Sequence, residues 1–300
     1  MPKPTETRAQ WVARKVRQRL RGPDPAPHPN QCFLIGCERS GTSPMARVMN
    51  AHPQVVMGNE RYATLYNEMR VSRDHYLVGP EHFTAERFLD FRPGDSHQLP
   101  PDFGVRHYEV AAQRFATGDV HWVGDKVLPP NVWLVRTLAD RFPHARFVLI
   151  YRDALDVCSS WKRRSDDPGD GWRDWNGYQA GLEHWHDGLD VAEWFLDGDA
   201  ADRLFLARCE WFFDEDPTYC ASMVRFLDLD MHPSIADNHA ERGAEFRRRR
   251  ATTASSLTEE ERQIVLAGSE PDRVARLDRV AEACRSGAGV SGSRPGSASS

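Results

Sequence analysis

Residues 33–60, with the sequence FLIGCERSGTSPMARVMNAHPQVVMGNE, contain the groups of an anion-binding site. Gly36 and Gly41 are separated by four residues and lie directly after an apolar run. Ser43 is a favourable N-cap and Pro44 a favourable first helical residue, so a helix is expected over 44–51. A strand, a Gly-bounded loop and a helix N-terminus direct backbone N–H groups and a helix dipole at one point, which favours a phosphate-like group.

The loop differs from the phosphate loop of nucleotide kinases. That motif has a Lys followed by Ser or Thr after the second Gly, and here Thr42 occupies the Lys position. The cation of this loop is Arg39, which lies between the two glycines. Taken alone, the stretch also fits a tight turn that caps a helix and binds nothing.

Charged residues follow several of the predicted strands. In a parallel α/β sheet, ligands gather at the carboxyl ends of the strands. The charged residues that follow successive apolar runs are Arg39, Glu60, Lys126 and Arg152. If these strands are parallel, three cations and one acid lie at one edge beside the anion loop. The alternative is that these residues are polar only because strand ends usually are. That would explain their polarity but not the presence of three cations around a phosphate-type loop.

Ser160 lies eight residues after Arg152, within the next predicted helix. This spacing allows an Arg fork and a hydroxyl to share one anion. The alternative is ordinary capping of that helix by Asp153 and Asp156.

The wider pattern predicts an α/β fold, a P-loop-like three-layer domain with a central, mostly parallel sheet. The run RFVLIY is apolar along its whole length, as expected of a central strand buried on both faces. Strands are expected over 32–37, 54–57, 121–124, 145–151 and 203–209. Helices are expected over 44–51, 132–141, 155–163, 178–195, 218–227, 259–266 and 272–284.

Composition excludes several classes of protein. The net charge of −5 argues against bulk nucleic-acid binding, while permitting a local basic pocket. The six Cys residues form no CxxC pair or zinc-finger spacing, which indicates free thiols in a reducing, cytoplasmic compartment. No apolar run approaches the length of a membrane span, and no metal site is suggested.

The chain is expected to divide into three parts: a basic helix and Pro-rich linker over 1–30, one domain over 31–285, and a disordered tail over 286–300. The basic segment 5–21 is interpreted as a surface helix, with weak membrane-surface contact as the alternative. The sequence leaves the oligomeric state open.

ERSGTS and RFVLIYRDALDVCSS together resemble the two phosphate-binding elements of the sulfotransferases that use 3′-phosphoadenosine 5′-phosphosulfate (PAPS). The similarity is closest to the tyrosylprotein sulfotransferase-like branch and its bacterial relatives, which share the segments Ala51-His52-Pro53 and Gly58-x-Glu60. It covers residues 31–230 well and 231–270 loosely.

The resemblance implies Glu60 as catalytic base, with Arg39 and Lys126 on the sulfuryl region. It also implies binding of the 3′-phosphate by Arg152 and Ser160. The remaining loop residues implied to bind PAPS are Ser40, Gly41, Thr42 and Ser43.

The third binding element of the family is a Gly- and basic-rich loop, and FRRRRATTASSLTEEE has the Arg run but lacks the Gly. One Arg of 247–250, with Arg249 and Arg250 as the candidates, would then cover the 3′-phosphate. The alternative is a solvated charged segment.

The expected reaction is transfer of the sulfuryl group of PAPS to an acceptor hydroxyl, without metal, leaving adenosine 3′,5′-bisphosphate (PAP). The acceptor is left open among a glycan, a lipid-linked sugar, a phenol and Tyr, and the segments 62–118 and 165–200 are expected to select it. A nucleotide kinase and a non-catalytic nucleotide-binding protein are the alternatives. Other branches of the fold use a His base, and the available residues are His52, His107, His121, His184 and His186.

Overall fold

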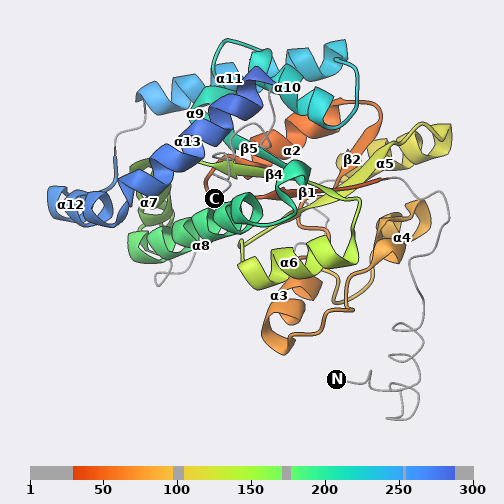
Figure 1. Cartoon of the computed structure of the whole chain (residues 1–300), viewed down its shortest axis with the longest axis horizontal. Helices are drawn as coiled ribbons and strands as arrows, with labels where there is room; N and C mark the ends of the chain where they lie inside the picture. The colour runs from red at the N-terminus through yellow and green to blue at the C-terminus, as the bar shows by residue number, and fades with distance from the viewer. Residues whose placement is uncertain (1–29, 97–104, 171–176, 253–254, 288–300) are drawn as a thin grey trace, which may run out of the picture.

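A five-stranded parallel sheet forms the centre of the protein (Figure 1). The computed structural model describes residues 30–96, 105–170, 177–252 and 255–287. The strands are β1 (Asn30–Ile35), β2 (Val55–Met57), β3 (Trp122–Val127), β4 (Arg146–Tyr151) and β5 (Leu204–Arg208), in the order β2-β3-β1-β4-β5. Every neighbouring pair is parallel. The predicted α/β fold with a mostly parallel sheet is therefore confirmed.

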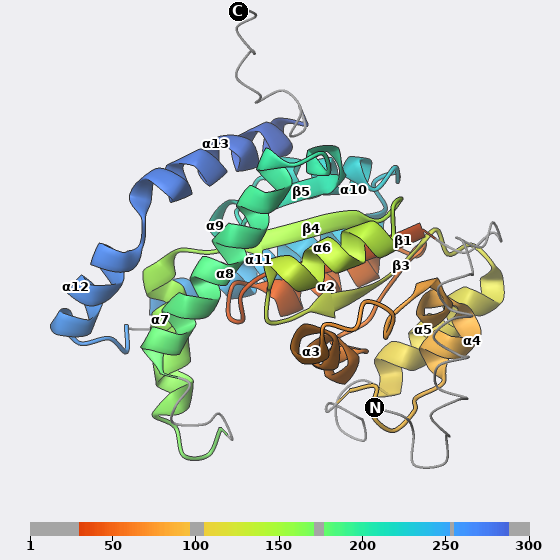
Figure 2. The same cartoon turned by 60° about the horizontal axis from the view of Figure 1, so that its bottom comes forward.

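Helices cover both faces of the sheet and complete three layers. In Figure 2, α6 and α8 lie on one face, and α2 and α11 lie on the other. The longer helices are α2 (Thr42–Ala51), α3 (Ala63–Ser72), α5 (Val105–Thr117), α6 (Val132–Arg141), α7 (Ala154–Ser165), α8 (Tyr178–Asp197), α10 (Thr218–Phe226), α11 (Pro233–Thr252), α12 (Glu259–Gly268) and α13 (Pro271–Ser286). The short ones are η1 (Pro80–Phe83), α4 (Ala85–Leu89), η2 (Ala201–Arg203) and α9 (Cys209–Phe212).

The apolar strands form the core with the inner faces of these helices. Phe33 of β1 lies at the centre of an aromatic cluster, with ring centroids 5.5 Å from Phe83, 5.2 Å from Phe142 and 5.4 Å from Phe147. All six Cys residues are buried and unpaired, which confirms the predicted free thiols. Burial raises the pKa of Cys158 to about 12, so this thiol stays protonated and is a poor nucleophile.

Two element boundaries differ from the prediction in ways that affect the site. Helix α2 begins at Thr42 with Gly41 as its N-cap, so Ser43 is not the cap, and its hydroxyl accepts a hydrogen bond from Lys126 instead. Strand β3 continues to Val127, so Lys126 lies inside the strand rather than after it. Pairing of β3 with β1 along its whole length explains the extension.

Strands β1, β2, β4 and β5 differ from their predicted ranges by one or two residues at one or both ends, and further differences lie outside the sheet. The segment expected to resemble a Gly-rich loop at 247–250 is the end of helix α11. Helix α13 continues to Ser286, one residue into the predicted tail. The rest of that tail from residue 288, the segment 5–21 and the linker up to residue 29 lie outside the described residues.

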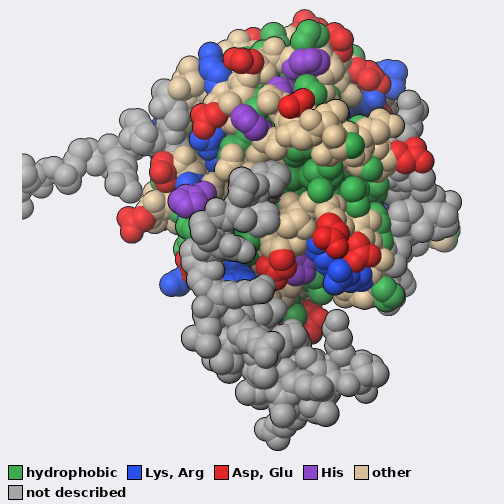
Figure 3. Space-filling model, turned by 90° about the vertical axis from the view of Figure 1, so that its right-hand side faces the viewer, with side chains coloured by type: hydrophobic (Ala, Val, Ile, Leu, Met, Phe, Trp, Pro, Cys, Tyr) green, Lys and Arg blue, Asp and Glu red, His purple; other side chains and the backbone are tan. Residues whose placement is uncertain are grey.

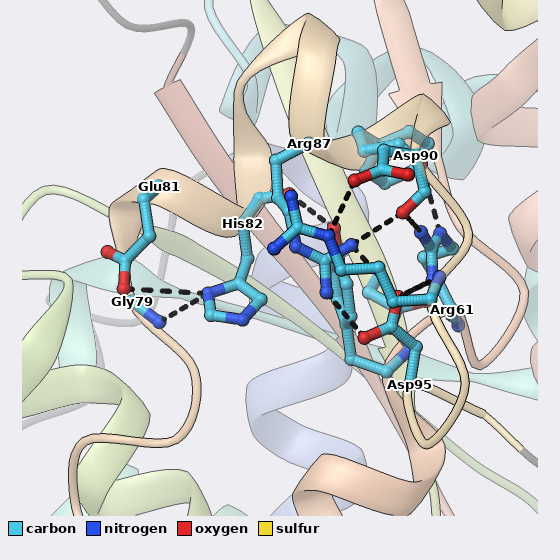
Figure 4. A network of polar contacts seen from close by, with 11 residues as sticks. Arg61, Gly79, Glu81, His82, Arg87, Asp90 and Asp95 are labelled. Atoms are coloured by element: carbon cyan, nitrogen blue, oxygen red, sulfur yellow. Dashed lines mark hydrogen bonds and ion pairs between the residues drawn. The ribbon is translucent and has the colours of Figure 1, made fainter. Parts of the chain in front are cut away.

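A buried ion-pair network ties together the first part of the segment between β2 and β3 (Figure 4). The guanidinium of Arg61 is buried and donates to Asp95 at 2.9 Å and to the carbonyl oxygens of Phe88 and Asp90 at 2.9 and 2.8 Å. Arg87 also pairs with Asp95. Burial alone would raise the pKa of Asp95, but the two guanidinium groups hold it below its usual range. Arg61 thus anchors the part of the chain that follows Glu60.

Candidate active site

The loop after β1 has the sharp turn that its sequence predicts. Arg39 and Gly41 adopt left-handed backbone conformations, with φ of 71° and 95°. A Cβ atom at Gly41 would lie 2.7 Å from the sulfur of Cys209, so a side chain is excluded there on steric as well as conformational grounds. The loop therefore leads directly from the carboxyl end of β1 into the N-terminus of α2, which is the geometry of an anion site.

Glu60, Lys126 and Ser43 meet on one side of this loop. The Lys126 ammonium lies 3.0 Å from the Glu60 carboxylate and donates to the Ser43 hydroxyl at 3.1 Å. Glu60 follows β2, Lys126 belongs to β3, and Ser43 is in the first turn of α2. The structure thus brings together the predicted base, the predicted cation and a loop hydroxyl. Arg61, the nearest alternative partner of Glu60 in the sequence, is directed at Asp95.

A cavity of about 640 Å³ also borders the loop. Its walls are the loop, the start of α7 and the second half of α11. The predicted binding residues that line it are Arg39, Gly41, Thr42, Ser43, Arg152, Ser160, Arg249 and Arg250. Ser40 is different, because its side chain is fully buried and its N–H donates to the carbonyl of Cys37 at 3.2 Å.

Ser160 is the meeting point of two guanidinium groups. It accepts from Nε of Arg39 at 2.9 Å and from Arg163 at 3.4 Å. The neighbouring Arg152 donates to the Arg39 carbonyl at 3.3 Å and pairs with Asp156 at 2.9 Å. Asp153 caps α7, as the alternative interpretation expected, while Arg152 and Ser160 still face the same cavity.

The cavity is strongly cationic in a chain of net charge −5. Eight arginines line it against three carboxylates. Burial lowers the pKa of Arg39 to about 10, and the nearby guanidinium groups of Arg164, Arg163 and Arg152 act in the same direction. On the face shown in Figure 3, by contrast, acidic, basic and hydrophobic side chains are interspersed. A concentration of like charge of this kind favours a multiply charged anion.

The second half of helix α11 forms one wall of the cavity. It contains the Arg run 247–250, which the sequence analysis interpreted either as a phosphate-binding element or as a solvated charged segment. Arg249 and Arg250 line the cavity, and their side chains are 71% and 51% exposed. Arg250 lies 3.6 Å from Asp156. Arg247 is directed elsewhere and donates to the Phe213 carbonyl at 2.9 Å. Phe246, which the sequence analysis did not select, lies under the guanidinium of Arg152 at 5.2 Å.

Three of the alternative histidine bases lie away from the anion loop. His52 ends α2, and its Nε2 lies 3.0 Å from the carbonyl of Asp230. His186 contacts the carbonyl of Gly268 at 2.7 Å. His121 is exposed just before β3 begins, at the opposite edge of the sheet. The side chain of His107 lies outside the described residues.

His184 contacts the loop from the side of α8. Its Nδ1 lies 2.9 Å from the carboxylate of Glu38, and the ring packs on Trp161 at 4.9 Å. Burial alone would lower the pKa of His184, but the hydrogen bond and charge of Glu38 outweigh burial and raise it. Trp161 also donates to the Glu38 carbonyl at 3.2 Å. Glu38 therefore ties the loop to α7 and α8, a role that its place in the sequence did not indicate.

The described residues contain neither a candidate metal site nor a candidate membrane-spanning helix. Within 30–96, 105–170, 177–252 and 255–287, no group of three or more His, Cys, Asp or Glu side chains could hold a metal ion. In the same part of the chain, no helix combines the length and apolar character needed to cross a bilayer.

Structural comparison finds similarity to sulfotransferases at low sequence identity. The sulfotransferase domain of the Synechococcus PCC 7002 olefin synthase is 15% identical, with a TM-score of 0.47, over 85% of this chain and 96% of that one. A sulfotransferase from Alicyclobacillus acidocaldarius is 17% identical, with a TM-score of 0.48 and the same coverage. Mouse sulfotransferase SULT7A1, solved in complex with PAP, is 12% identical, with a TM-score of 0.42, over 77% of this chain and 67% of that one.

Sequence comparison with curated proteins gave no match. The sequence pattern of the sulfotransferase family, however, matches residues 31–233, which is more than half of the chain. This region contains the anion loop, Glu60, Lys126, Arg152 and Ser160, and ends just as α11 begins. The chain belongs to the sulfotransferase family.

Proposed function

We propose that the protein transfers the sulfuryl group of PAPS to an acceptor hydroxyl, with Glu60 as the general base. The observation that supports this most directly is the contact of Glu60 with Lys126, 3.0 Å apart, beside the loop that closes the arginine-lined cavity. A base, a cation and a large anion site are thus adjacent, as transfer of a charged group to a hydroxyl requires.

The cavity fits the nucleotide part of PAPS. Its volume is within the range of cofactor sites, about 300–1,000 Å³. Arg152 and Ser160, with Arg249 or Arg250 opposite, would hold the 3′-phosphate, and the loop from Arg39 to Ser43 would hold the 5′-phosphosulfate. PAPS supplies the activated sulfuryl group. A nucleotide kinase is less well supported, because Thr42 stands where the kinase loop has Lys. The residues here suit an anion held by arginine forks and backbone N–H groups.

Glu60 would take the proton of the acceptor hydroxyl as the acceptor oxygen forms its bond to sulfur. The bond between sulfur and the bridging oxygen breaks at the same time, and its electron pair stays on the phosphate of PAP. Lys126 and Arg39 would stabilise the negative charge that develops there.

A transfer screen tests the proposal. Labelled PAPS is incubated with the protein and a glycan, a lipid-linked sugar, a phenol or a Tyr peptide, without divalent metal, and transferred label is counted. Label on one acceptor class supports the proposal and identifies the acceptor. Tight binding of PAP with no transfer to any class would instead favour the non-catalytic nucleotide-binding alternative.

A further inference from the structure

The chain makes an unusual turn directly before and at Glu60. It leaves β2 at Gly58, whose N–H donates to the Gly124 carbonyl of β3 at 2.8 Å. Glu60 then adopts a left-handed backbone conformation with φ of 57°. This conformation is unfavourable for a residue with a side chain, so it persists only where surrounding contacts hold it.

Two of the backbone contacts that follow Glu60 come from one carboxylate, that of Asp125 in β3. Its Oδ1 accepts the N–H of Arg61 at 2.9 Å, and its Oδ2 accepts the N–H of Tyr62 at 3.0 Å. Oδ1 also accepts the N–H of Lys126 at 2.9 Å. The Asp125 carboxylate thus holds the backbone of the two residues that follow Glu60. It also holds the backbone of Lys126, whose side chain pairs with Glu60.

Gly58 makes this approach possible. A Cβ atom at Gly58 would lie 2.5 Å from Oδ1 of Asp125, so a side chain there would push the carboxylate away. The Gly58-x-Glu60 segment and the Asp125-Lys126 pair are therefore one structural unit, although they are more than 60 residues apart in the sequence.

Asp125 is an unlikely residue for a purely structural site. It is fully buried inside a strand, and burial raises its pKa to about 7 against the opposing effect of its three N–H donors. A buried carboxylate is costly, and a neutral residue would fill the same volume without that cost. A neutral Asn, however, offers one acceptor oxygen where the turn uses two.

We propose that Asp125 is the positioning residue of the active site, which fixes the Glu60 carboxylate against Lys126 by holding the backbone of the turn. The inference rests on the proposed function, since it assigns Asp125 a role through the proposed base. Asp125 is not among the residues that line the cavity, so nucleotide binding is expected to be independent of it.

The test compares Asp125→Asn with Asp95→Asn. Both changes remove a buried carboxylate near Arg61, but Asp95 contacts its guanidinium and Asp125 contacts its backbone. Turnover, PAP affinity and melting temperature are measured for both variants. We expect Asp125→Asn to lose about 10–10²-fold in kcat, the effect of a slightly misplaced catalytic group. PAP affinity should stay within about twofold, as for independent sites.

Asp95→Asn should lower the melting temperature and leave kcat nearly unchanged. An equal loss of kcat in both variants would overturn the inference, because loosening of the segment would then explain it. A double-mutant cycle adds a second criterion. In the Glu60→Gln background, Asp125→Asn should cost little further activity, because it acts through Glu60. Full additivity of the two losses would overturn the inference as well.

A spectroscopic readout separates this inference from the proposed function. The chain has only four Lys residues, so selective ¹⁵N-lysine labelling gives a simple spectrum in which Lys126→Arg assigns one side-chain signal. Asp125→Asn should shift the Lys126 ammonium signal as much as Glu60→Gln does, while Asp95→Asn should not. An unchanged signal would overturn the positioning role even if no acceptor is ever found. Absence of transfer by the wild-type protein, with the signal shifted, would count against the proposed function alone.

Discussion

The guanidinium of Arg39 donates to the hydroxyl of Ser160 across 2.9 Å, although the two residues are 121 positions apart. The family resemblance implies different parts of one ligand for them, the 5′-phosphosulfate for Arg39 and the 3′-phosphate for Ser160. Their contact shows that the loop after β1 and the helix α7 already form one surface. The cavity behind them is therefore expected to bind its anion with little rearrangement of the backbone.

Replacement of Arg152 by Ala should weaken PAP binding by about 2–4 kcal/mol, because a charge-assisted fork at a phosphate is lost. Calorimetry without divalent metal measures the change. Arg208→Ala is the matched control, since Arg208 also lies at the carboxyl end of its strand and has a similar side-chain exposure, 22% against 19% for Arg152. Equal affinity of the wild-type protein for PAP and for adenosine 5′-phosphate would remove the 3′-phosphate assignment.

Replacement of Glu60 by Gln should lower kcat by roughly 10²–10⁴-fold and leave PAP affinity nearly unchanged. The physical reason is that the amide cannot accept the hydroxyl proton, whereas the nucleotide cavity does not include Glu60. Steady-state kinetics and calorimetry on the same preparation give both quantities. A variant that kept most of its turnover would return His184 to the list of candidate bases.

Stability should fall as the pH rises above about 6.5, in part through His184. The raised pKa of His184 means that its pairing with Glu38 is fully present below the ordinary value of 6.5 and is lost as the pH passes the raised value. His184 is 30% exposed, so the effect on melting temperature should be less than about 4 °C.

Melting curves of the wild type and of Glu38→Gln between pH 5.5 and 8.5 isolate this contribution. Other groups titrate in the same range, including Asp125, whose pKa is raised to about 7 and which acts in the same direction. These groups are common to both proteins, so only the difference between the two curves reports on His184. Parallel curves would show that the pair contributes nothing to the pH dependence of stability.

PAP should raise the melting temperature, and more strongly at low salt. Burial is the main cause of the lowered pKa of Arg39, and the charges of Arg164, Arg163 and Arg152 add to it. The ligand would relieve the repulsion among these guanidinium groups. At a concentration 100 times its Kd, a ligand stabilises the folded protein by about 2.7 kcal/mol. Thermal shifts at low and high ionic strength measure the effect. The same shift at both ionic strengths would indicate that charge is not the main source of affinity.

The sequence was most informative where a local motif and the sheet agree. The loop between Gly36 and Gly41 has the turn that its residues predict. The apolar run before Arg152 is a buried parallel strand, as predicted. Because the carboxyl ends of parallel strands share one edge, the sequence also predicted that Glu60 and Lys126 lie at the same edge, although Lys126 is inside β3 and not after it.

The sequence was least informative where a tertiary contact decides the local structure. Ser43 has the residue type of an N-cap, yet its hydroxyl is used by Lys126, and the left-handed Gly41 starts the helix earlier. Helix α11 has few apolar residues, so its periodicity is weak, and packing against α2 determines it. The role of Glu38 depends on His184, 146 positions away, which no spacing rule reveals.

Strand β1 lies at the centre of the sheet, between β3 and β4. Lys126 comes from one neighbour and Arg152 follows the other, so the two halves of the site meet only at the loop. Substitutions on the β3 side should change the rate of the chemical step, and those on the β4 side should change the affinity for the nucleotide. In a kinetic survey of point variants, the type of kinetic defect would then follow the position of the nearest strand in the sheet. Acceptor choice could be changed by substitutions on the β3 side without weakening nucleotide binding on the β4 side.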